Sequence, residues 1–186
     1  ISQMAAALDA GAEIINDVTG LEGDPGMMSL VVRSHAGVCA MHMRGTPQTM
    51  QDDPRYDDVV NEIAAYLAAR RDALFCAGVL PESVCLDPGI GFGKTPEHNL
   101  ALLRRQRELL DLGPPLLLGW SRKSTLGQLT GRPVSQRLVA SVAAALAAVQ
   151  HGARIVRVHD VGATVDALRV WEAAGLSDAG LNSVTI

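Results

Sequence analysis

Charged and polar side chains follow short apolar runs at five places in this chain. Carboxylates and amides can bind the polar edge of a heterocycle, and cationic side chains can hold an anion beside it. The five places are Asn16-Asp17, His42 with Arg44, Asp87, Ser121-Arg122-Lys123-Ser124, and Arg157 with His159-Asp160. Because burial disfavours ionisable groups, their recurrence at the ends of apolar runs indicates one functional site.

The stretch LDPGIGFGK, residues 86–94, ends an apolar run on a carboxylate, Asp87. Three glycines follow it: Gly89, Gly91 and Gly93. Only two residues separate the second glycine from Lys94, which does not fit a P-loop. A dinucleotide-binding turn is also disfavoured, because the next helix starts only at Thr95-Pro96 and proline lacks an amide donor. We expect instead a loop whose backbone closes over a flat ligand, with the Phe92 ring against it.

The residue types also indicate the chemistry of the ligand. Asp87 can accept two parallel N–H bonds from an amidine-like edge, such as that of a 2-amino-4-oxo pyrimidine ring. Asn16 can both donate and accept, so it can bind a mixed edge. Lys123, Arg157 and His159 supply cationic donors that suit an anionic leaving group such as a diphosphate. The sequence therefore predicts a heterocycle that carries a phosphate or lies beside one.

For single positions, a purely structural role stays open. Asn16 or Asp17 can cap the turn that follows, as is common in strand-to-helix loops. His42 can be a core histidine, and Arg157 can form a structural ion pair with Asp87 or Asp160. Phe92 can be ordinary packing.

The elements that must position these groups share one pattern: a helix end, a glycine, an apolar strand and then polar residues. Strands are expected within residues 8–18, 33–44, 75–89, 115–124 and 149–161. Helices are expected at 25–34, 57–77, from Thr95 onward, 135–151 and 163–174. The helix at 135–151 is apolar on more than one face, so we expect it to be well buried. Alternating strands and helices predict an α/β fold with a parallel sheet, and leave an open doubly wound sheet and part of a (β/α)8 barrel as equal alternatives.

Composition limits the possible partners. The 186 residues carry a net charge of −4, which argues against nucleic acid and anionic membranes. Three cysteines without a CxxC spacing predict free thiols in a reducing cytoplasm, and the histidines show no metal-ligand spacing. No uncharged apolar run reaches membrane-spanning length. Because Ile1 opens what looks like the tail of a helix, we expect one domain, residues 1–186, that lacks its N-terminal part.

Five motifs together resemble dihydropteroate synthase of the bacterial type, the folate-pathway enzyme that sulfonamides inhibit. They are INDVTGL (15–21), MHMRGTPQTMQ (41–51), DPGIGFGK (87–94), GWSRKS (119–124) and RVHDV (157–161). The resemblance implies a partial (β/α)8 TIM barrel in which the chain supplies units four to eight, with five parallel strands, and the first three strands are absent. It also implies the reaction: (7,8-dihydropterin-6-yl)methyl diphosphate condenses with 4-aminobenzoate to give 7,8-dihydropteroate and diphosphate.

The resemblance further implies a role for each matching residue. The pterin would be bound by Asn16, Met41, Asp87, Lys123 and Arg157. The diphosphate would be held by Arg157 and His159. The 4-aminobenzoate site, where sulfonamides compete, would be bordered by Phe92 and Ser124, with Gly89 and Gly91 in the adjoining loop. In this family the C–O bond to diphosphate breaks first, a stabilised pterin-methyl cation forms, and the arylamine then attacks.

The same resemblance implies partners outside the chain. Mg²⁺ is the expected cofactor, held by an asparagine upstream of Ile1, with no metal ligand in this chain. Because other substrate-binding loops also lie upstream, we expect the 186 residues alone to be inactive. The family is usually a homodimer, formed through its late helices.

Two alternatives remain. A methyltetrahydrofolate-corrinoid methyltransferase shares the Asn and Asp strand ends but does not need the cations for a diphosphate. A degenerate pterin-binding or purely structural barrel fragment is the other, and the intact set of Lys123, Arg157 and His159 argues against it.

Overall fold

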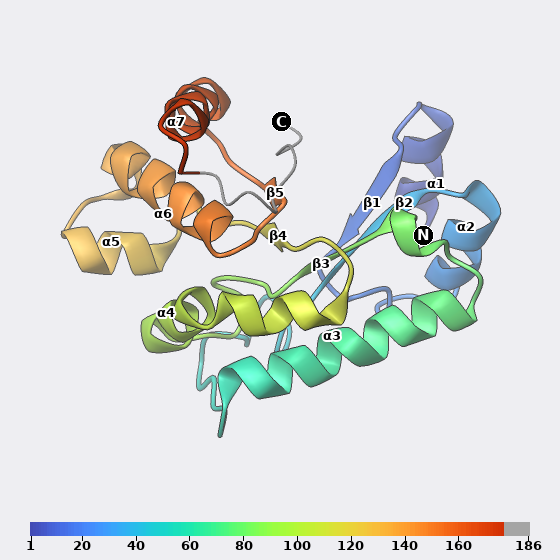
Figure 1. Cartoon of the computed structure of the whole chain (residues 1–186). Coiled ribbons are helices and arrows are strands. Elements are labelled where there is room, and N and C mark those ends of the chain that lie inside the picture. Colours follow the sequence, from blue (N-terminus) through green and yellow to red (C-terminus); the bar gives the residue numbers. More distant parts are fainter. Residues whose placement is uncertain (177–186) are drawn as a thin grey trace.

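The computed structural model describes residues 1–176 and has an α/β fold in which helices alternate with parallel strands (Figure 1). The strands are β1 (Ile14–Asp17), β2 (Gly37–Met41), β3 (Val84–Asp87), β4 (Leu117–Leu118) and β5 (Ile155–Val156). The α-helices are α1 (Ser2–Asp9), α2 (Met27–Ser34), α3 (Val59–Cys76), α4 (Pro96–Arg104), α5 (Ser124–Thr130), α6 (Leu138–Gln150) and α7 (Val161–Ala173). Short 3₁₀ segments are η1 (Pro81–Ser83), η2 (Gln106–Leu112) and η3 (Val134–Gln136). The end of the expected domain, 177–186, lies outside the described residues.

The strands pair in chain order, and every pair is parallel. β1, β2 and β3 form one sheet, and β4 and β5 form a second. An isolated parallel bridge between Leu86 and Leu116 joins the two, and the Leu86 N–H donates to the Pro115 carbonyl at 3.0 Å. Parallel pairing brings the carboxyl ends of the strands to one edge, as the sequence predicts.

Alternate residues of each strand face different sides of the sheet. On one side Val38, Ala40 and Leu86 are at most 1% exposed. They belong to the main core together with Ile63 and Leu67 of α3. Figure 1 shows α3 and α4 running along this side of the strands, with α1 and α2 toward one end and α5 to α7 toward the other. The opposite side holds a smaller cluster: Cys39, Cys85, Leu117 and Ile155. Most of the hydrophobic core therefore lies on one side of the sheet.

Two helices start where capping chemistry predicts. The Asp58 carboxylate accepts two backbone N–H groups of the first turn of α3. Thr95 caps α4: its hydroxyl accepts the His98 N–H, and the His98 ring accepts the Thr95 N–H, each at 3.2 Å. The helices predicted at 57–77 and from Thr95 are thereby confirmed, with slightly shifted ends.

The strand predicted at 115–124 is wrong in extent. β4 contains only Leu117 and Leu118, because the chain turns at Trp120, whose carbonyl accepts the Lys123 N–H at 3.2 Å. Arg122 in this turn has a φ of 60°. Ser124 is therefore the first residue of α5, a helix that the sequence pattern did not reveal.

The helix predicted at 135–151 is less buried than expected. It is α6, preceded by η3. Ala145 and Ala148 face the core at 3% and 0% exposure, whereas Val139 is 80% exposed. Residues that are apolar on several faces of a helix therefore need not all be buried. Neither α6 nor another helix among residues 1–176 is long and apolar enough to cross a lipid bilayer.

Candidate functional site

Four of the predicted site residues lie on one face of the sheet near the strand ends. They are Asn16, Met41, Asp87 and Arg157. Met41 is the register partner of Asp87, and the Arg157 N–H continues the β5 ladder by donating to the Leu118 carbonyl at 3.0 Å. Asn16 is exposed, whereas Met41 is fully buried. This face is the one opposite the main core, so strand alternation alone brings the four residues to the same side.

Asp87 is a fully buried carboxylate, 0% exposed. Its Oδ1 accepts the Gly89 N–H at 2.7 Å, and its Oδ2 accepts from Nη2 of Arg157 at 2.9 Å. Burial raises the pKa of Asp87, while the charge of Arg157 and the Gly89 N–H act against that rise. Each carboxylate oxygen accepts one of these bonds and has a second lone pair, so two acceptor positions remain, which a ligand can reach only when the groups that bury Asp87 move aside.

Arg157 reaches Asp87 by crossing the chain at Gly119. A Cβ at position 119 would lie 2.9 Å from Nη2 of Arg157, so a larger residue there would displace the guanidinium. Nη1 of Arg157 is buried without a hydrogen-bond partner among the described residues. An unpaired buried donor is costly, so this nitrogen is suited to an acceptor atom of a ligand.

Lys123 and Phe92 lie against each other across the site. Nζ of Lys123 is 4.1 Å from the centre of the Phe92 ring, a cation–π contact. A Cβ on Gly91 would lie 3.0 Å from Cδ of Lys123, so the glycine leaves room for the lysine stem. Burial lowers the pKa of Lys123, and the charge of Asp87 acts against this. Ser124 follows Lys123 and is exposed.

His159 is exposed, and Ser121 sets its orientation. Nδ1 of His159 lies 2.9 Å from the Ser121 hydroxyl, which also accepts the His159 N–H at 3.2 Å. Because Nδ1 is occupied, Nε2 is the ring nitrogen that can reach an anion. Arg122, in the same motif as Lys123, instead pairs with Asp160 at 2.8 Å.

Other strand-end groups have structural roles. The Asp17 carboxylate accepts bonds from the turn that follows β1, so its capping role is confirmed. Arg44 pairs with Glu62 at 2.6 Å and covers the Tyr56 ring at 4.0 Å. His42 is 5% exposed and is a core histidine. These three candidates do not join Asp87 at the site.

Sequence reasoning missed the residues that hold the glycine loop in place. Asn99 of α4 is 1% exposed; it accepts the Gly91 N–H at 2.9 Å and donates to the Thr125 hydroxyl at 3.0 Å. Gln51 donates to the Gly91 carbonyl at 2.8 Å. The available signal for Asn99 was an amide in the first turn of a helix that follows a loop of functional interest. Gln51 gave no such signal.

Acidic pH is expected to destabilise the protein through His42. Burial, with the charges of Lys94 and Arg44, lowers the pKa of His42 to about 3. An unfolded histidine binds its proton near a pKa of about 6.5, so below that pH the unfolded state binds more protons and stability falls. The His42 contribution to unfolding free energy between pH 7 and 5 is about 2 kcal/mol. Urea unfolding should show a flatter pH dependence for His42→Phe, and equal slopes would contradict this account.

The described residues do not by themselves fit a Mg²⁺ site. Among residues 1–176, no group of three or more His, Cys, Asp or Glu side chains gathers as metal ligands. The side chains nearest the expected diphosphate are cationic, whereas Mg²⁺ needs oxygen ligands. A magnesium ligand upstream of Ile1 therefore stays a prediction, and no step proposed below passes through a metal.

Comparison with known proteins identifies the family to which the chain belongs. The sequence profile described as pterin binding enzyme matches residues 1–159. The dihydropteroate synthase of Neisseria meningitidis serogroup B is 51% identical over 181 residues, which cover 95% of this chain and 63% of that protein. The structure of the Xanthomonas albilineans dihydropteroate synthase in complex with 7,8-dihydropteroate superposes with a TM-score of 0.87 at 45% identity, covering 94% of this chain and 63% of that one. The Yersinia pestis dihydropteroate synthase with a sulfonamide drug gives 0.90 at 40% identity, covering 95% and 64%. The chain thus spans about two thirds of its relatives' length, and it belongs to the pterin binding enzyme family.

Proposed function

We propose that this chain carries the pterin and diphosphate groups of a dihydropteroate synthase. The whole protein would condense (7,8-dihydropterin-6-yl)methyl diphosphate with 4-aminobenzoate, giving 7,8-dihydropteroate and diphosphate. The observation that carries the proposal is the buried carboxylate of Asp87 at a strand end, paired with Arg157 and close enough to Lys123 for their charges to interact. Relatives of this name at 51% and 45% identity support it.

On the pterin side, Asp87 supplies the acceptor that a 2-amino-4-oxo pyrimidine edge requires. Gly89 and Arg157 fix its position, so the carboxylate itself is already oriented, but the groups that bury it must move aside when the ring binds. Asn16 lies on the same face and is exposed for a mixed edge, and Lys123 adds a donor. Met41 is the register partner of Asp87 on the neighbouring strand and is expected to pack against the pterin ring, although its side chain is fully buried. A negative Asp87 also favours the pterin-methyl cation as positive charge develops on the ring.

On the diphosphate side, Arg157 and His159 supply the donors. The unpartnered Nη1 of Arg157 and the free Nε2 of His159 are both suited to phosphate oxygens. They stabilise the charge that grows on the departing diphosphate, which is where electrostatic catalysis acts most strongly. The arylamine is nucleophilic as it stands, so the chain needs no general base.

The 4-aminobenzoate site is proposed to lie beside the glycine loop, residues 89–93. Phe92, half-buried beneath Lys123, offers a ring face to 4-aminobenzoate, and the exposed Ser124 lies next along the chain. Gly89 and Gly91 have no side chains, so they let the loop backbone come close to the substrate. A sulfonamide, which has the same aryl-amine end, would compete here, and the sulfonamide complex of the Yersinia pestis relative supports this.

Five further expectations belong to this proposal. The strands are units four to eight of a (β/α)8 barrel, Mg²⁺ is bound by an upstream ligand, the protein is a homodimer through its late helices, and it works in the cytoplasm. The 186 residues alone are inactive, and measurable turnover by them would contradict this.

The proposal is tested with a full-length protein, in which this chain is joined to the part of its relatives that it does not span. Diphosphate release is measured with the pterin diphosphate and Mg²⁺, with and without 4-aminobenzoate. We expect release to require 4-aminobenzoate and to fall by about 10²-fold in Lys123→Ala, which removes one charged donor. Arg122→Ala is the matched control, because its side chain pairs with Asp160 instead, and it should change release little.

Two outcomes would overturn the proposal. Pterin binding without diphosphate release would favour the related methyltransferase or a degenerate binder. Equal losses in Lys123→Ala and Arg122→Ala would show that the motif matters for folding and not for the ligand.

A further inference from the structure

Lys94 is a buried lysine with two hydrogen-bond partners, and the proposed chemistry does not use it. It is 3% exposed, and with Lys123 it is one of two lysines in the sequence. Its Nζ donates to the Phe92 carbonyl at 2.9 Å and lies 3.0 Å from Nδ1 of His42. A charged side chain is rarely buried to this extent unless it is paired, so these two contacts need an explanation.

The direction of the bond to His42 follows from the surroundings. Burial lowers the pKa of His42 to about 3, so the ring is neutral and Nδ1 can accept. Burial also lowers the pKa of Lys94 to about 7, while the charge of Asp87 acts against this and the charges of Lys123 and Arg44 add to it. In either protonation state Nζ has N–H groups for both acceptors. Lys94 is therefore a bridge between the glycine loop and the end of β2.

The loop is pressed against the same segment of chain. Gly89 has a φ of 70°, and a Cβ there would collide with the His42 carbonyl. Gly93 has a φ of 63°, and a Cβ there would lie 2.6 Å from the Arg44 carbonyl. Two neighbouring backbone groups of Phe92 are also held, because its N–H donates to the Gly89 carbonyl at 3.0 Å and its carbonyl accepts from Lys94.

We propose that Lys94 is a positioning residue that fixes the Phe92 ring for the aryl-amine substrate. By joining the Phe92 carbonyl to His42, it sets where the ring stands against Lys123 and hence the shape of the wall that 4-aminobenzoate and sulfonamides contact. Lys94 thereby governs affinity for the second substrate more than pterin binding, because its two side-chain contacts are with Phe92 and His42 and it acts on Asp87 only through its charge. This inference rests on the proposed function, in which Phe92 borders the 4-aminobenzoate site.

The test compares Lys94→Met with Thr95→Ala in the full-length protein, in which this chain is joined to the part of its relatives that it does not span. Methionine keeps the apolar stem and removes the donor. Thr95→Ala removes the α4 cap one residue away without touching Phe92, so it controls for lost stability. Loss of a hydrogen bond to a charged group is expected to raise the KM for 4-aminobenzoate and the Kd of a sulfonamide about tenfold. The KM for the pterin diphosphate should stay within about twofold, and Thr95→Ala should change none of the three constants by more than that.

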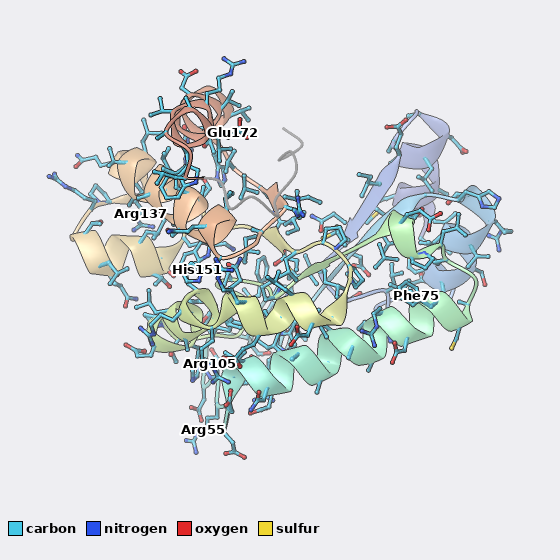
Figure 2. The ribbon with its side chains drawn as sticks, viewed as in Figure 1. Arg55, Phe75, Arg105, Arg137, His151 and Glu172 are labelled. Atoms are coloured by element: carbon cyan, nitrogen blue, oxygen red, sulfur yellow. The ribbon has the colours of Figure 1, made fainter. Side chains whose placement is uncertain are left out.

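A structural readout accompanies the kinetics and does not depend on activity. Phe75 and Phe92 are the two phenylalanines of the sequence, and Figure 2 shows Phe75 toward the C-terminal end of α3, far from Arg55 and Arg105 around its N-terminal end. With 4-fluorophenylalanine placed at position 92 alone, or at position 75 alone as the reference, the ¹⁹F resonance of position 92 should shift or broaden in Lys94→Met. The resonance of Phe75 should not move.

The outcomes separate this inference from the proposed function. An unmutated protein that releases no diphosphate removes the proposed function and this inference with it. An active protein in which Lys94→Met weakens pterin and 4-aminobenzoate equally, or leaves both unchanged with a fixed Phe92 resonance, overturns the inference alone. If Lys94→Met does not fold, His42→Phe removes the acceptor and keeps the lysine. It should then raise the KM for 4-aminobenzoate selectively, and an unchanged KM would equally overturn the role of Lys94.

Discussion

In the full-length protein with the proposed activity, replacing Asp87 by Asn is expected to lower kcat/KM for diphosphate release by about 10³-fold, the loss that corresponds to two hydrogen bonds to a charged group. The carboxylate accepts from Gly89 on one oxygen and from Arg157 on the other. An asparagine has one acceptor and one donor end, so in either orientation its NH₂ group faces an N–H donor. The ring edge of the pterin would also meet a donor where it needs an acceptor, and Arg157 would lose its counter-charge.

The measurement is steady-state release of diphosphate, together with the binding constant of the pterin. Asp58→Asn is the matched control, since it makes the same change in a carboxylate that also pairs with an arginine, Arg105, at 3.0 Å. That pair lies near the surface, and asparagine is also a good helix cap, so the control should change kcat/KM by no more than about twofold. Equal losses in both variants would mean that the Asp87 effect is general destabilisation.

Replacing Gly89 by Ala is expected to lower the free energy of unfolding by about 3 kcal/mol, of which about 1 comes from the left-handed backbone and about 2 from steric overlap. Its φ is 70°, and the added Cβ would collide with the backbone carbonyl of His42. A backbone carbonyl at a strand end cannot move away as a flexible side chain can. The loop must therefore shift, and it would carry the hydrogen bond between Gly89 and Asp87 with it.

Gly131→Ala separates the two contributions. Gly131 has nearly the same φ, 67°, but no atom lies within 4 Å of its added Cβ. We expect this variant to lose about 1 kcal/mol in urea unfolding, and diphosphate release should persist. A loss as small in Gly89→Ala would show that the loop can move away from His42 without cost.

The sequence pattern predicts the strand ends well because strand alternation needs no long-range information. Asp87 ends an apolar run, which predicts its place at a strand end, whereas the face that it takes is known only from the register of β2 and β3. The Asn99 and Gln51 contacts to Gly91 join residues 8 and 40 positions apart. The local signal for such contacts is weak or absent, so the support of the loop was missed.

Local sequence patterns also do not predict which carboxylate an arginine pairs with. Arg157 can pair with Asp87 or Asp160 from sequence alone, and the pairing seen joins residues 70 positions apart. It depends on Gly119 leaving space for the guanidinium. For α6 the local pattern predicted too much: its hydrophobicity indicated burial on several faces, whereas Val139 is largely exposed.

The crossing of Arg157 over Gly119 affects how natural variants of this protein should be interpreted. A glycine-to-alanine exchange at position 119 alters no charge and no predicted ligand contact. By residue type alone it would be classed as a conservative substitution. Its added methyl group would nonetheless lie 2.9 Å from the guanidinium that neutralises Asp87. An exchange at this position therefore changes the Asp87–Arg157 pair through a residue whose contribution to the site is the absence of a side chain.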